Sequence, residues 1–132
     1  MKALVWTAPR VMELREEPVP VAGAGEALIQ VIAAGICGSD LGGYLGHNSL
    51  RKPPLIMGHE AAGKILEAPK GELSDGTEAR EGQRVTFNPL ISCGKCDRCS
   101  AGLPNLCRVR KLVGAHRPGA FAEYVAAPLS LC

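Results

Sequence analysis

The chain has 132 residues, of which 46% are hydrophobic and 21% are charged, a composition typical of one soluble globular domain. A formal net charge of +2 is too small for the basic surface that binds nucleic acids, so we expect no nucleic-acid partner. The longest stretch without Asp, Glu, Lys or Arg covers residues 27–39. A membrane span needs roughly 18 residues, so we expect no membrane partner.

The amino terminus and the cysteines indicate the cellular compartment in which the protein works. Residues 1–6 do not combine a basic start with a long apolar run, as a signal peptide does, so we expect a cytoplasmic protein. In that reducing compartment the six cysteines favour metal binding or catalysis over disulfides.

In chain order, apolar patterns separated by turn formers predict mostly short strands and one short helix, which begins with Ser39 or Asp40 as its N-cap. The segment 69–81 is polar and is expected to be a solvated connection. Sixteen glycines and ten prolines provide the turns of a mainly β fold, a small antiparallel barrel. The expected elements are strands at 2–6, 11–15 and 26–34, the helix at 39–44, and strands at 60–67, 84–87 and 121–126.

A cysteine-rich segment, residues 91–111, interrupts this pattern. Its spacing is C-x2-C-x2-C-x7-C, formed by Cys93, Cys96, Cys99 and Cys107. Tight C-x2-C turns present thiolates to one ion, and four thiolates close the tetrahedral sphere of Zn2+ with no open position. We therefore predict a structural zinc lobe at this segment.

Two other interpretations of these cysteines are less favoured. A disulfide pair suits an exported protein, and closely spaced cysteines pair poorly with one another. Iron–sulfur proteins also begin C-x2-C-x2-C, but their fourth cysteine follows after three residues and precedes a proline. Here the gap is seven residues and Arg108 follows Cys107, which argues against an iron–sulfur electron carrier.

A second group of candidate ligands lies outside the lobe. Cys37 directly follows the central apolar strand, and His59 and Glu60 lie at the start of the next predicted strand. A thiolate, an imidazole and a carboxylate with one position left open describe a catalytic zinc site. Asp40 is placed to accept a hydrogen bond from the second ring nitrogen of His59, and Ser39 to bond a hydroxyl at the metal.

Together these motifs resemble the N-terminal, GroES-like catalytic domain of zinc-dependent medium-chain alcohol and polyol dehydrogenases. Besides the cysteine lobe, the resemblance lies in segments that follow the family's order and span nearly the whole chain: 25–31, 33–40, 58–63, 82–85 and 119–124. It implies one domain over residues 1–132, folded as a partly open β-barrel with a short helix and the zinc lobe on its side.

The resemblance also implies roles for individual residues. Cys37 and His59 match the ligands of the catalytic zinc, Glu60 matches a residue that alternates as a ligand or supports one, and Ser39 matches the hydroxyl that contacts the substrate. The four lobe cysteines match the structural zinc ligands. The implied reaction oxidises a small-molecule alcohol through a zinc-bound alkoxide, with hydride transfer to NAD(P).

The chain departs from the family pattern in particular places. Gly42 stands where many relatives carry a proton-relay histidine, and His47, five residues later, is expected in a solvent-exposed loop. No G-x-G-x-x-G motif occurs, so we expect the Rossmann domain that binds NAD(P), and one further catalytic zinc ligand, to be absent from these residues. Cys132 is expected to be an incidental thiol.

Without a cofactor domain, the 132-residue chain is expected to bind zinc in the lobe, to hold zinc far more weakly or not at all at the catalytic site, and to show no alcohol oxidation. Steady NAD-dependent turnover by the pure chain would contradict this expectation. The face that would pack on the cofactor domain is expected to favour a homo-oligomer, which a size measurement at several concentrations would detect. A stand-alone zinc-binding interaction module without catalysis is the alternative function.

Overall fold

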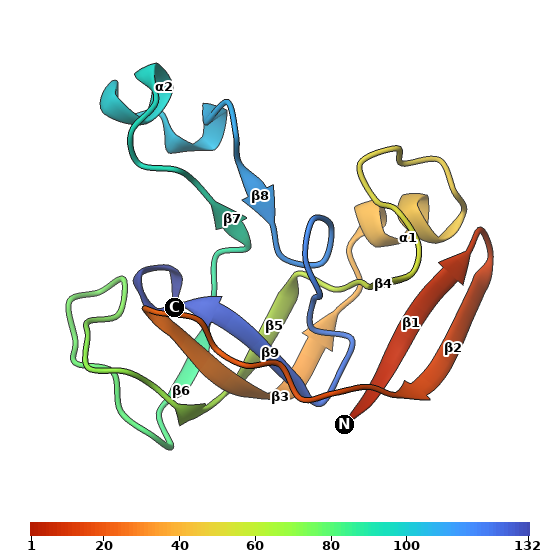
Figure 1. The fold of residues 1–132 in the computed structure, drawn as a ribbon, viewed down its shortest axis with the longest axis horizontal. Coiled ribbons are helices and arrows are strands. Elements are labelled where there is room, and N and C mark those ends of the chain that lie inside the picture. The colour runs from red at the N-terminus through yellow and green to blue at the C-terminus, as the bar shows by residue number, and fades with distance from the viewer.

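The computed structural model describes residues 1–132 as antiparallel sheets joined by loops and a few short helices (Figure 1). This mainly β architecture confirms the predicted fold class. The strands are β1 (Lys2–Ala8), β2 (Val11–Glu16), β3 (Glu26–Gly35), β4 (Leu55–Ile56), β5 (Glu60–Glu67), β6 (Arg84–Thr86), β7 (Leu90–Ile91), β8 (Lys111–Leu112) and β9 (Tyr124–Pro128). The helices are α1 (Gly38–Tyr44), α2 (Asp97–Ser100) and the 3-10 turns η1 (Pro104–Leu106) and η2 (Leu129–Leu131).

Two sheets form the body of the domain. One has the strand order β2-β1-β4 and the other the order β6-β5-β3-β9, and every neighbouring pair is antiparallel. The sheets meet where the segment before β9 passes β1, because Ala3 forms a bridge with Ala122 and the Leu4 N–H donates to the Phe121 carbonyl oxygen at 2.8 Å. The result is the partly open barrel that the sequence predicts.

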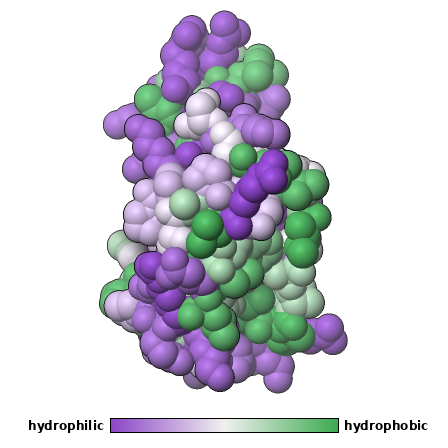
Figure 2. Space-filling view, turned by 90° about the vertical axis from the view of Figure 1, so that its right-hand side faces the viewer, coloured by the Kyte–Doolittle hydropathy of each residue, from purple (hydrophilic) through white to green (hydrophobic).

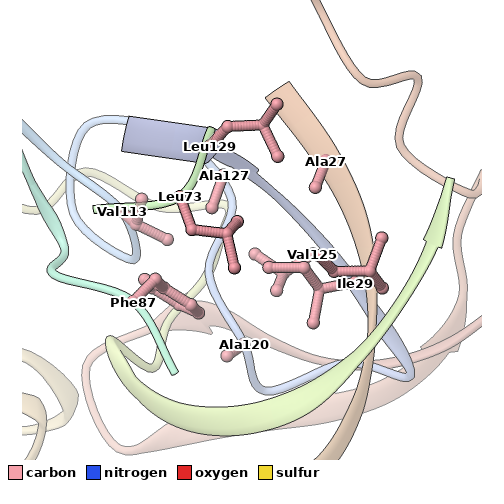
Figure 3. Close-up of a cluster of buried hydrophobic side chains, with 10 residues drawn as sticks. Ala27, Ile29, Leu73, Phe87, Val113, Ala120, Val125, Ala127 and Leu129 are labelled. Atoms are coloured by element: carbon pink, nitrogen blue, oxygen red, sulfur yellow. The ribbon is translucent and has the colours of Figure 1, made fainter. Parts of the chain in front are cut away.

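The main hydrophobic core lies on the inner face of the four-stranded sheet (Figure 3). Alternate residues of β3 and β9 enter it, as the two-residue period of a strand requires. Loops from outside the sheet close the cluster. Its ten buried residues are Ala27, Ile29, Ile65, Leu73, Phe87, Val113, Ala120, Val125, Ala127 and Leu129.

The connection at 69–81 is not solvated throughout, so that prediction is wrong at Leu73. The side chain of Leu73 is only 7% exposed and belongs to the main core. An isolated bridge between Glu72 and Glu78 folds the loop back on itself. Burial of one leucine offsets the ordering cost of an otherwise polar loop by roughly 1.5–3 kcal/mol.

Several element boundaries differ from the prediction by a few residues, and the starts of the last strand and of the helix have a structural cause. The last strand begins at Tyr124 rather than at residue 121, because Phe121 bonds to two different segments, donating its N–H to the Met57 carbonyl oxygen and accepting from Leu4. Helix α1 has Cys37, not Ser39 or Asp40, as its N-cap. Asp40 instead occupies the third helical position and accepts the Cys37 N–H at 3.2 Å.

The cysteine-rich segment projects from the body on a two-stranded ribbon (Figure 1). Strands β7 and β8 pair Leu90 with Leu112 and Ile91 with Lys111. This pairing brings the two ends of the segment 91–111 side by side, so the segment forms a separate lobe, as predicted.

Apolar side chains also reach the surface. Figure 2 shows the side on which β1, β2 and α1 lie, where hydrophobic and hydrophilic residues alternate in patches. Leu14 on β2 is 71% exposed and Leu41 on α1 is 54% exposed. No helix is long and apolar enough to cross a membrane. Self-association through an apolar face stays a prediction.

Three glycines, Gly58, Gly114 and Gly119, allow the segment before β9 to lie close to the backbone that leads into β5. A Gly119→Ala variant tests whether this close contact matters. Its new Cβ would overlap the Gly58 carbonyl oxygen and lie 2.6 Å from the Met57 carbonyl oxygen. We expect the free energy of unfolding to fall by roughly 1–3 kcal/mol in a denaturant titration.

The matched control is Gly42→Ala in α1, because no heavy atom lies within 4 Å of its new Cβ. Alanine favours a helix over glycine by about 1 kcal/mol, so this variant is expected to be as stable as the parent or more stable. Equal stability of Gly119→Ala and the parent would show that the two backbones are not held in close contact.

Candidate metal centres

The four lobe cysteines converge on one point. All four sulfurs lie within 4.8 Å of one another, and Cys107 is completely buried. The Cys96 sulfur lies 3.6 Å from that of Cys99 and 4.0 Å from that of Cys107. A tetrahedral ion with sulfur ligands at about 2.3 Å separates them by about 3.8 Å, so the donor set and its spacing fit Zn2+. All six cysteines of the chain are free thiols, so the structure gives no support to the disulfide interpretation.

Backbone N–H groups in the lobe are directed at its sulfurs, and that of Cys93 donates to the Cys107 sulfur at 3.4 Å. Those of Arg108 and Cys99 lower the pKa of the Cys96 thiol to about 6, and those of Lys95 and Cys96 lower the pKa of Cys93. Desolvation, followed by the neighbouring Cys96 sulfur, raises the pKa of Cys99 to about 11. The lobe therefore stabilises some thiolates through its backbone, and only a cation would allow all four to ionise together.

The charged side chains around the lobe are partly paired with each other. Arg108 makes a two-point contact with Asp97, in which Nε and Nη2 each donate to a carboxylate oxygen at 2.7 Å. This pairing lowers the pKa of the Asp97 carboxyl, and the positive charge of Arg108 is already paired with that carboxylate. Arg110 donates instead to the Cys107 carbonyl oxygen at 3.3 Å.

The second cluster forms where two paired strands meet. Cys37 follows β3, whereas His59 and Glu60 lie at the start of β5, and the antiparallel register places Gly35 opposite Glu60. One ligand atom from each of Cys37, His59 and Glu60 lies within 4.8 Å of the others. The Glu60 side chain covers Gly35, where a Cβ would lie 2.7 Å from the carboxylate, so a side chain at 35 would displace Glu60.

Asp40 lies behind this cluster and contacts two of its members. The residue is 2% exposed, and its Oδ2 accepts the Cys37 N–H while its Oδ1 lies 3.2 Å from the Nδ1 of His59. The predicted Asp40–His59 contact is therefore present, although its alignment does not complete a hydrogen bond at the buried Nδ1. Because Nδ1 faces Asp40, Nε2 is the ring nitrogen left for a metal.

Ser39 lies two positions after Cys37 in the sequence. It lies exposed in the first turn of α1, and its Oγ accepts from Nη2 of Arg51 at 3.4 Å. Arg51 is buried, and no pattern in the sequence identifies it, because an arginine in a proline-containing loop suggests an exposed residue. His47 is exposed in the loop after α1.

An open hollow of about 590 Å³ lies beside His59 and Glu60. Small residues form much of its wall, with Ala33, Ala34 and Gly35 on the β3 side. A larger hollow, of about 820 Å³, lies between β1 and the segments 50–56 and 111–118, and no member of either cluster lines it. We place the candidate reaction site at the smaller hollow because two of the candidate metal ligands, His59 and Glu60, line it.

The two clusters differ in the way that structural and catalytic zinc sites differ. The lobe offers four thiol ligands around a buried sulfur. The second cluster offers one thiol, one imidazole and one exposed carboxylate, which leaves an open side.

Comparisons with known protein families and with individual proteins identify the same family. Residues 23–132 match the family described as "Alcohol dehydrogenase GroES-like domain". Starvation-sensing protein RspB of Escherichia coli is 41% identical over 129 residues, which cover 97% of this chain and 37% of that protein. L-threonine 3-dehydrogenase of Streptomyces coelicolor is 40% identical over 136 residues, covering 98% of this chain and 38% of that protein.

Solved structures of similar proteins lead to the same family. The E. coli CFT073 rspB alcohol dehydrogenase, complexed with NADH, superposes with a TM-score of 0.86 at 38% identity, over 99% of this chain and 37% of that one. An alcohol dehydrogenase of Thermotoga maritima gives a TM-score of 0.90 at 26% identity, over 98% of this chain and 38% of that one.

The chain thus spans little more than a third of the length of these relatives. The match nevertheless covers most of the 132 residues and includes both cysteine-containing clusters. The chain belongs to the alcohol dehydrogenase GroES-like domain family and corresponds to the N-terminal domain of the zinc-type alcohol and polyol dehydrogenases.

Proposed function

We propose that residues 1–132 form the zinc-binding catalytic domain of an NAD(P)-dependent dehydrogenase that oxidises a small-molecule alcohol. The observation that carries this proposal is the presence of two metal-binding clusters of unlike composition in one domain. A zinc module with a purely structural role needs only the closed set of four cysteines. The Cys37, His59 and Glu60 cluster beside an open hollow is the additional feature that a reaction requires.

The names of the relatives support an alcohol substrate. They include L-galactonate-5-dehydrogenase of E. coli at 30% identity and galactitol-1-phosphate dehydrogenase of E. coli, whose structure gives a TM-score of 0.85 at 28% identity. Each named compound carries hydroxyl groups. In this proposal NAD(P) binds outside residues 1–132 and accepts the hydride. The free cysteines fit a reducing compartment, and we place the reaction in the cytoplasm.

In the lobe, Cys93, Cys96, Cys99 and Cys107 would hold a structural zinc. The β7–β8 ribbon supplies two paired residues on each side, and the helical segments within the lobe are only three and four residues long. This amount of regular structure is too small to keep the lobe folded by itself. A bound metal would therefore stabilise it.

At the open site, Cys37, His59 and Glu60 would hold a second zinc, which when bound supplies a Lewis acid that lowers the pKa of a hydroxyl. Asp40 faces His59 Nδ1 and accepts the Cys37 N–H, so Nε2 would be the ring nitrogen that binds the metal. The exposed Ser39 hydroxyl would accept a proton from the substrate hydroxyl while it releases its own proton to solvent. With glycine at position 42, water would take the place of the relay histidine.

A Cys96→Ser variant tests the lobe. We expect it to lose the lobe zinc and to melt at a lower temperature, because structural zinc binding is coupled to folding. Metal analysis and thermal melting provide the measurement. The control is Cys132→Ser, since Cys132 lies in neither cluster and partial burial raises the pKa of its thiol to about 11. Unchanged metal content and melting temperature in Cys96→Ser would show that the lobe assignment is wrong.

The open site is tested by Co2+ added to protein whose lobe already holds zinc. We expect a bound Co2+ whose visible absorption bands shift when an alcohol is added, because only an open coordination position admits a ligand. His59→Ala is expected to weaken Co2+ binding more than roughly 100-fold, beyond the range for residues that merely support a ligand. His47→Ala is the control, because His47 is exposed in a loop. If Co2+ binds no second site, or if alcohol leaves its spectrum unchanged, this catalytic function is excluded.

A further inference from the structure

Arg51 and Asp40 are the two charged residues buried in this domain, at 6% and 2% exposure. Their side chains form an ion pair in which Nη2 of Arg51 lies 3.0 Å from Oδ1 of Asp40. A buried charge needs a partner, and removing one member of such a pair leaves the other uncompensated. The carboxylate that contacts His59 therefore depends on Arg51.

The guanidinium of Arg51 also connects separate parts of the fold. Its Nη1 donates to the Ser39 carbonyl oxygen at 3.0 Å, and its Nε donates to the Gly114 carbonyl oxygen at 3.2 Å. Arg51 thus contacts the first turn of α1 and the turn after β8 at the same time. The planar, multiply donating guanidinium suits this role better than a lysine ammonium would.

Both contacts lead to the candidate metal site. On one side, Asp40 in α1 accepts the Cys37 N–H and faces Nδ1 of His59. On the other side, the Gly114 turn packs against Gly58, the residue before His59, so closely that a Cβ at 114 would overlap the Gly58 carbonyl oxygen. Arg51 therefore connects the segment that carries Cys37 to the segment that carries His59.

The space around Arg51 is matched to its side chain. A Cβ at Gly43 in α1 would lie 2.8 Å from Cδ of Arg51 and 3.2 Å from Sδ of Met57. The helix thus leaves room for the arginine to pass beneath it. This fit argues that the buried arginine belongs to the native packing of the site.

We propose that Arg51 is a positioning residue for the Cys37, His59 and Glu60 cluster. It holds Asp40 Oδ1 at 3.2 Å from Nδ1 of His59, where the carboxylate charge favours the tautomer with its proton on Nδ1 and leaves Nε2 for a metal. The inference rests on the proposed function in treating this cluster as a metal site. Its effect on the imidazole, however, exists without any metal there.

The first test is NMR of the ring nitrogens of the three histidines, in protein whose lobe alone holds zinc. We expect His59 to carry its proton on Nδ1 in the parent and to become a mixture of tautomers in Arg51→Met. His116 is an internal reference, because its Nδ1 accepts the Leu112 N–H at 3.0 Å and must be unprotonated. If the His59 tautomer is the same in both proteins, the proposal is wrong, whatever happens to the melting temperature.

The matched control is Arg117→Met. Arg117 is also partly buried and makes a two-point contact with a carboxylate, that of Glu26. Its loss is expected to lower stability and to leave the His59 tautomer unchanged. A tautomer change of the same size in this control would reduce Arg51 to a general structural role and overturn the proposal.

The second test is the affinity for added Zn2+ at the open site. We expect Arg51→Met to weaken it about 10–100-fold, the usual range for residues that orient a metal ligand, and to leave the lobe zinc bound. Asp40→Asn should weaken it as well, and the loss in the double variant should be smaller than the sum of the two single losses, because Arg51 acts in part through Asp40. Additive losses would contradict the proposal.

Arg51→Lys covers the case in which Arg51→Met loses the lobe zinc and fails to fold. Lysine keeps a positive charge beside Asp40 but does not reach all three acceptors, so we expect an intermediate loss of Zn2+ affinity; parental affinity would overturn the inference. If the parent protein takes up no second Zn2+, the proposed function fails, whereas the histidine tautomers still decide the role of Arg51.

Discussion

The antiparallel pairing of β3 with β5 is the constraint on which the candidate reaction site depends. Its register places Gly35 opposite Glu60, so the residues just beyond the end of one strand meet the residues that start the other. Cys37 and His59 are 22 positions apart in the chain, yet this pairing brings their ligand atoms within 4.8 Å. The buried Asp40–Arg51 pair then supports that arrangement from behind.

The lobe depends on residues that are close in sequence and is nearly independent of the barrel. Its four cysteines lie within 15 consecutive residues, and a two-residue pairing of β7 with β8 connects them to the body. The barrel has its own core of ten buried residues. Metal binding in the lobe is therefore a local folding event, whereas metal binding at the open site depends on the packing of the whole barrel.

Local spacing and strand periodicity predict much of this structure. The lobe follows from cysteine spacing, and β5 has the predicted bounds of 60–67, where the inward-facing residues Ala61, Gly63 and Ile65 alternate with exposed ones. Long-range contacts explain the failures. Leu73 enters the core from a polar loop, Phe121 bonds to two segments without a regular ladder, and Arg51 pairs with Asp40 across a loop. None of these contacts leaves a pattern in neighbouring residues, so sequence reasoning does not find them.

The central claim is that Cys37 and His59 bind a metal ion that is separate from the ion of the lobe. Anomalous diffraction at the zinc absorption edge tests this claim most directly. Crystals grown with excess zinc are expected to show two peaks in each chain. One peak should lie among the four lobe sulfurs, and the other between Sγ of Cys37 and Nε2 of His59. A lobe peak alone, with Cys37 and His59 too far apart to share a ligand position, would contradict the account.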